Sequence, residues 1–67
     1  MENELSKDSV KRLLNHWIEH NESHSASFRE RAAQIARVSE KAAQDINQAA
    51  ELMDQCTEML RNAMQDL

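Results

Sequence analysis

The chain has 67 residues, a formal net charge of −4, no glycine, no proline and a single cysteine. Chains this short seldom stabilise themselves with one core, so we expect a partner chain or a bound metal; an internal disulfide is excluded. Sheets need turn residues that are missing here, and the acidic balance disfavours nucleic acid. No apolar run reaches the roughly 20 residues that cross a membrane. These features predict an all-helical, cytoplasmic protein.

The first predicted helix begins near Ser9, where Ser6 or Asp8 can serve as its N-cap. Apolar residues then follow at steps of three and four, which places them in one stripe along the helix. In the middle of this stripe, polar residues take the apolar positions, namely Asn21, His24 and Ser25. A weakened core in this segment indicates a local function.

All three histidines lie in the same segment, at His16, His20 and His24. Their spacing aligns the imidazoles in a nearly axial row on one helix face. Neighbours four residues apart have Cβ atoms about 6 Å apart, close enough for two ring nitrogens to hold one metal ion. The outer two are too far apart for one straight helix to bring all three to one ion. The third ligand requires a bend near residues 21–25 or the second chain of a dimer.

Four further side chains, three of them in the histidine segment, are candidates for supporting roles at this site. Glu19 and Glu22 can add oxygen ligands or accept hydrogen bonds that orient the imidazoles. Trp17 is expected to pack in the core and to exclude water from the metal. Cys56, on the second half of the chain, is a further candidate ligand. Imidazole suits Ni, Zn, Cu and Co, so the spacing alone does not choose the metal.

An enzymatic interpretation rests on His16, Glu19 and His20, which match the H-x-x-E-H pattern of the inverted zincins. Such a short pattern is common by chance, and a protease needs a cleft and a distal third ligand. This chain has no spare sequence to form them. We therefore expect that the protein is not an enzyme.

Two positions could interrupt the helical pattern. Residues 27–30 have the sequence of a capping box, while Ser39 can cap a second helix after a tight turn at Val38–Ser39. The second choice divides the chain into two helices of similar length that form a hairpin. In this hairpin His20 would lie near Cys56 and Trp17 near Met59. The alternative is one long, nearly continuous helix in a dimeric coiled coil.

The second half carries an unbroken alternation of three- and four-residue steps between apolar residues. Its predicted inner face consists of Ala42, Ile46, Ala49, Met53, Cys56, Leu60, Ala63 and Leu67. Two hairpins with such alanine-rich faces would form a four-helix bundle by dimerisation. We expect one domain, residues 1–67, that combines metal binding with dimerisation. The competing hypothesis is a structural oligomerisation module whose polar histidine seam only fixes register.

The segment from His16 to His24 resembles the HW-x2-H-x3-H signature of the CooJ-type nickel-binding proteins, which are accessory factors in carbon monoxide dehydrogenase maturation. The match covers His16, Trp17, His20 and His24 with all spacings intact. The resemblance implies a homodimer that binds Ni(II) through the three histidines, with Trp17 as companion residue. It also implies that the protein stores nickel or delivers it to a client metalloenzyme or another nickel chaperone. It does not extend to the His- or Cys-rich tail of some members, because no histidine follows His24.

Overall fold

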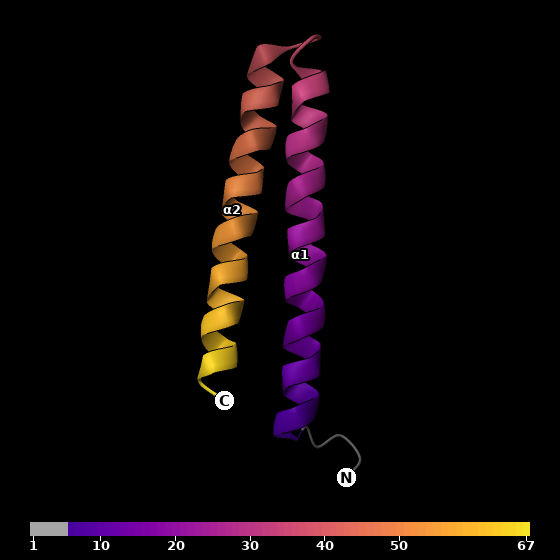
Figure 1. The fold of residues 1–67 in the computed structure, drawn as a ribbon. Helices are drawn as coiled ribbons and strands as arrows, with labels where there is room; N and C mark the ends of the chain where they lie inside the picture. Colours follow the sequence, from indigo (N-terminus) through magenta and orange to yellow (C-terminus); the bar gives the residue numbers. More distant parts are fainter. Residues whose placement is uncertain (1–5) are drawn as a thin grey trace.

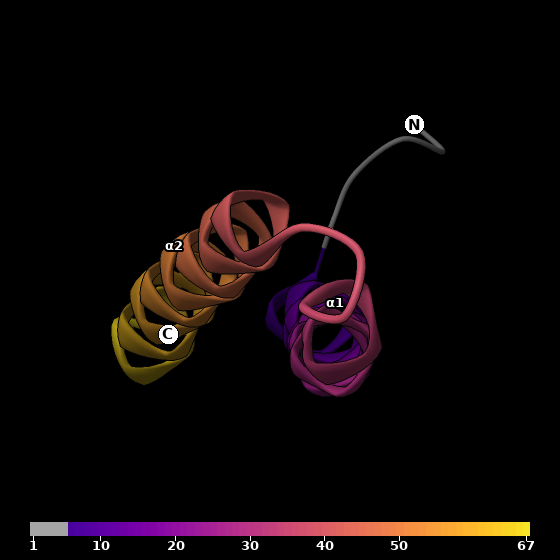
Figure 2. The same cartoon turned by 90° about the horizontal axis from the view of Figure 1, so that it is seen from above.

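The computed structural model describes residues 6–67, which form two helices, α1 (Lys7–Ile35) and α2 (Glu40–Gln65), packed as an antiparallel hairpin (Figure 1). Seen along their length, the helices lie side by side in a single layer (Figure 2). The molecule measures 52 × 20 × 14 Å and has a radius of gyration of 15.7 Å. A compact domain of this length would have a radius of about 11 Å. The expected helical hairpin is therefore confirmed, as an elongated rod.

A reciprocal capping interaction starts α1. The backbone N–H of Ser9 donates to the Ser6 hydroxyl at 3.1 Å, and the backbone N–H of Ser6 donates to the Ser9 hydroxyl at 3.0 Å. These bonds satisfy donors that the first turn of a helix leaves free. The predicted cap at Ser6 is confirmed, and the helix begins at Lys7, two residues before the predicted start.

The turn between the helices lies where Val38–Ser39 predicts it. The Ile35 carbonyl accepts hydrogen bonds from the backbone N–H groups of Val38 and Ser39, each at 2.8 Å. Ser39 is extended and its hydroxyl accepts the N–H of Ala42 at 3.1 Å, which caps α2. No residue in the described chain has a positive φ, so the turn needs no glycine. The alternative of one continuous helix is wrong, and α1 passes through residues 27–30 without a break.

Small side chains dominate the contact between the two helices. The buried residues are Leu14, Ile18, Ser25 and Ala32 in α1 and Ala43, Ala50 and Thr57 in α2. Small residues let the helix backbones approach closely, but they remove little apolar surface from water. No large side chain in the described part of the chain is fully buried.

The inner face of α2 differs from the predicted one. Ala49 and Cys56, which we expected inside, are exposed, while their neighbours Ala50 and Thr57 are buried. Pairs of small residues at these positions allow either member to face α1, so the apolar pattern alone selected the wrong member. The orientation that forms also turns charged residues of α2 toward α1.

Two interhelical ion pairs use that orientation. Arg29 binds Asp54 at 2.8 Å, and Arg61 forms an ion pair with Glu22. All four residues lie on one flank of the contact between the helices, because each follows a core position in the seven-residue pattern. A rotation of α2 that buried Cys56 would move Asp54 and Arg61 away from their partners on α1. The hairpin therefore has one flank closed by ion pairs, and we call this its ionic face.

Candidate metal-binding site

Two of the three histidines meet on the exposed surface of α1. The Nε2 atoms of His20 and His24 lie 3.0 Å apart, and the ring centroids are 4.4 Å apart with the rings at 70°. The ring of His16 stacks on that of His20 at a centroid distance of 6.1 Å. On its other side, His24 lies against Phe28, with ring centroids 6.2 Å apart. The row predicted from the spacing is present, with His20 and His24 as its close pair.

No third ligand from the described part of the same chain joins this pair. Among residues 6–67, no group of three histidine, cysteine or acidic side chains is close enough to hold a metal ion. The bend that would have brought His16 and His24 together is absent, because α1 is helical from Lys7 to Ile35. The part of one protomer that the structure describes therefore offers two converging ring nitrogens, and further ligands must come from outside it.

The two glutamates of the segment point away from the histidine pair. At 100° per residue, the helix turns Glu22 to the side opposite His20. Its carboxylate is engaged there by Arg61 of α2. Glu19 is exposed and also lies off the His20–His24 edge. A direct role for either carboxylate at the paired nitrogens would need a change of helix face.

Cys56 lies beside the histidine segment, as the hairpin register predicts, although its closest polar partner is not a histidine. The amide nitrogen of Asn21 donates to the Cys56 sulfur at 3.6 Å. Asn21 follows His20 directly in the chain, so the predicted register is correct to within one residue. The thiol is exposed instead of buried.

Trp17 also lies outside the helix contact. Its exposed fraction is 43%, and that of Leu13, one turn earlier, is 38%. The expectation that Trp17 anchors the hairpin core is wrong, since Leu14 and Ile18 take that place. The indole lies on the same side of α1 as His20 and His24, because residues three, four and seven apart share a helix face.

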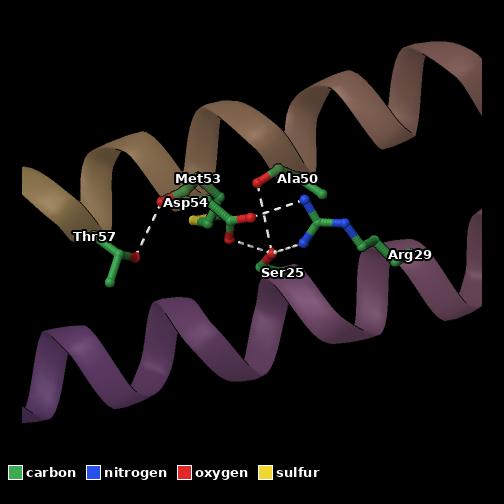
Figure 3. Close-up of polar contacts among 6 residues, drawn as sticks. All are labelled: Ser25, Arg29, Ala50, Met53, Asp54 and Thr57. Carbon is green, nitrogen blue, oxygen red and sulfur yellow. Dashed lines mark hydrogen bonds and ion pairs between the residues drawn. The ribbon is translucent and has the colours of Figure 1, made fainter.

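A polar cluster that begins at Ser25, the residue after His24, crosses the hairpin (Figure 3). The Ser25 hydroxyl is buried, donates to Asp54 Oδ1 at 2.6 Å and accepts from Arg29 Nη1 at 2.6 Å; the Ala50 carbonyl lies 3.5 Å away. Arg29 Nη2 donates to Asp54 Oδ2 at 2.8 Å. These three side chains thus form a closed set of hydrogen bonds between α1 and α2.

The hydrogen bond from Arg29, aided by that from Ser25 and by the guanidinium charge, lowers the pKa of the Asp54 carboxyl below its usual value, although partial desolvation opposes the change. On α2, the buried Thr57 hydroxyl bonds back to the Met53 carbonyl at 3.0 Å. Every buried side-chain polar atom of residues 6–67 has a hydrogen-bond partner. In the sequence, only Ser25 indicated this cluster, because it is a polar residue at an apolar position. Its partners Arg29 and Asp54 were not predicted.

The fold and these side chains define a class, a short antiparallel helical hairpin with paired imidazoles on its surface. Residues 10–67 match the family described as Domain of unknown function (DUF8180), and the chain belongs to that family. Neither the curated proteins nor the solved structures contain a significant match. Within residues 6–67, neither helix is long and apolar enough to cross a membrane.

Proposed function

We propose that this protein is a nickel-binding metallochaperone that acts as a homodimer, in which two hairpins form a four-helix bundle. His20 and His24 supply two ligands to Ni(II), and His16 of the second chain completes the set. Trp17 is the companion residue. The ion is stored or passed to a client metalloenzyme or another nickel chaperone, and the protein catalyses no reaction.

The observation that carries this proposal is the 3.0 Å separation of the two Nε2 atoms. Two nitrogens about 2.1 Å from one ion are about 3.0 Å apart at a right angle and about 3.4 Å apart at a tetrahedral angle. This separation suits neighbouring positions in a square-planar or octahedral ligand set. Ni(II) and Cu(II) adopt such sets, whereas Zn(II) prefers a tetrahedron, and Co(II) is a further in vitro candidate.

Protons compete with the metal at this pair. In the metal-free protein, the same separation allows one neutral imidazole to donate its Nε2–H to the other. Binding one ion through both Nε2 atoms requires both lone pairs, so the remaining protons must reside on Nδ1. Binding should therefore weaken as the pH falls, because a protonated imidazole has no lone pair to give to the metal.

Release to a client then proceeds by ligand exchange. The segment of α1 beneath the histidines packs through Asn21 and Ser25, which bury little apolar surface compared with leucine or isoleucine. A client that loosens this segment would separate the two nitrogens. Replacing Asn21 by leucine should strengthen the packing and slow nickel dissociation; equal dissociation rates in the two proteins would contradict this route.

Calorimetric titration of the metal-free protein with nickel, then zinc, tests the proposal, with Trp17 fluorescence recorded in parallel. We expect nickel to bind with a dissociation constant below about 1 μM, at one ion per chain or per dimer, and zinc to bind more weakly. An Asn15→Ala protein, changed at an exposed position on the side of α1 away from His20 and His24, is the matched control. Binding weaker than about 0.1 mM for both metals would overturn the metallochaperone role.

The second candidate is a structural oligomerisation module without a physiological metal. It is favoured by the absence of a three-ligand group among residues 6–67 and by the Ser25–Arg29–Asp54 cluster, which joins the helices without any ion. Such a module would keep its thermal midpoint when a chelator or nickel is added.

A further inference from the structure

Large apolar side chains are exposed along one side of the hairpin. Beyond the turn residue Val38, the exposed large apolar residues of the described chain are Leu13 and Trp17 in α1 and Leu52 and Met59 in α2, the last two at 58% and 68% exposure. Within each helix these residues follow steps of four and seven, so each pair forms a row. Isolated exposed apolar residues are common, whereas two parallel rows need an explanation.

The two rows lie on the same broad face. The ion pairs Arg29–Asp54 and Glu22–Arg61 show which flank of α1 meets which flank of α2 on the ionic face. The exposed apolar rows occupy the other flank of each helix, so they share the opposite broad face. The Asn21–Cys56 hydrogen bond crosses the hairpin on this second side. We call it the uncharged face and define it by Leu13, Trp17, His20, Leu52, Cys56 and Met59.

This face is uncharged over a long stretch. From residue 10 to 24 in α1 and from 49 to 63 in α2, the positions that belong to these rows contain no aspartate, glutamate, lysine or arginine. Charged residues make up 30% of the chain, so they have been concentrated elsewhere, including on the ionic face. A surface that stays in water has no reason to exclude charge in this way.

The size of the face matches a protein interface. The broad side of the rod, 52 by 20 Å, offers about 1,000 Å² in projection, and a stable interface buries about 800 Å² per partner. The hairpin needs such a contact, because its interior has no fully buried large side chain. Helices whose apolar residues face both a neighbour and the outside are typical of bundles with more than two helices.

We propose that a second copy of this chain packs its own uncharged face against this one, leaving the ionic faces outside. In a two-fold dimer each residue near the axis meets its equivalent in the partner, so a charge there would face a like charge. The uncharged face avoids that repulsion, whereas the ionic face would place carboxylates and guanidinium groups near their equivalents. The inference specifies the interface of the proposed homodimer and does not depend on nickel.

Sedimentation equilibrium of the full chain in the presence of EDTA tests this interface. Leu52→Glu places a charge on the uncharged face, and Gln55→Glu places the same charge on the outer side of the same helix. We expect dimers for wild type and Gln55→Glu, and at least tenfold weaker dimerisation for Leu52→Glu. A monomeric wild type, or equal dimerisation of the two variants, would overturn the proposal.

A second measurement avoids variants, because Leu52→Glu could fail to fold if folding requires the dimer. Trp17 is partly exposed in one hairpin and would be covered by the second copy. Acrylamide quenching of wild-type Trp17 should therefore decrease as protein concentration rises through the dimerisation range. A dimer with unchanged Trp17 quenching would place the interface elsewhere. Both experiments lack metal, so a failure of nickel binding leaves them intact, and a monomeric result leaves nickel affinity measurable.

Discussion

At the level of single side chains, the imidazole geometry ranks the three histidines. His20 and His24 are paired through their Nε2 atoms, while His16 stacks on His20 without converging on the same point. We predict that His20→Ala and His24→Ala each weaken nickel binding by at least about tenfold, since even residues that only orient a metal ligand contribute that much. His16→Ala should cost less. Calorimetry decides: a larger loss for His16→Ala would show that another set of atoms holds the ion.

Among single residues, Asp54 is the one expected to make the stability of the fold depend on pH. Its pKa is lowered in the folded chain, chiefly by the hydrogen bond from Arg29. Its ionised form therefore stabilises the fold above the unfolded pKa of about 3.9, and this contribution is lost as the pH falls through the lower, folded value.

We predict that Asp54→Asn lowers the urea midpoint at pH 7 and reduces its fall between pH 5 and pH 2. Urea unfolding across this range measures both effects. Glu51→Gln, which removes a carboxylate one turn earlier on α2 and outside the cluster, is the matched control. If the two variants lose the same acid sensitivity, the Ser25–Arg29–Asp54 cluster has no special role.

At the scale of the helices, we predict different effects on stability when Ser39 and Ser27 are replaced by alanine. Both begin sequences that read as helix starts, but only Ser39 caps a helix, while Ser27 lies inside α1. Ser39→Ala should cost about 1 kcal/mol of unfolding free energy, which corresponds to a loss of about 4–8 °C in the thermal midpoint. Ser27→Ala should cause no loss, because alanine is the better helix former. Circular dichroism melts of the two variants compare them directly, and a greater loss for Ser27→Ala would contradict the position of the turn.

The elements themselves were largely predictable from sequence, and the reason lies in these caps. Ser6 and Ser39 act through hydrogen bonds to residues three positions away, which a sequence displays directly. The rotation of α2 was not predictable in the same way. Ala49 and Ala50, like Cys56 and Thr57, are neighbours of similar size, so hydrophobicity barely separates the two candidate inner faces. Contacts with α1 decide between them, and those depend on register.

The candidate metal-binding site was likewise predictable from the sequence only in part. Helical spacing predicts that His20 and His24 come together, because four residues make about one turn. Spacing does not show the rotamers that place the two Nε2 atoms 3.0 Å apart. Nor does it show that Trp17 leaves the interior, since this follows from Leu14 and Ile18 filling the space against α2.

For the whole molecule, nickel and stability should be linked. A ligand that binds only the folded dimer stabilises it, by about 2.7 kcal/mol at a free concentration 100 times its dissociation constant. We predict that nickel raises the thermal midpoint by several degrees and that EDTA returns it to the metal-free value. Melts should be repeated with the His20→Ala, His24→Ala double variant, whose midpoint should not respond. A nickel-insensitive wild type would favour the structural oligomerisation module.

The turn at Val38–Ser39 has a kinetic consequence. It is built without proline, and no proline occurs elsewhere in the chain, so folding has no slow prolyl isomerisation step. Most residue contacts in this protein lie within one helix or the other and are therefore local in sequence, which is typical of chains that fold within microseconds to milliseconds. The association of two subunits, and not the folding of each chain, would then limit the rate at which newly made protein forms the proposed dimer.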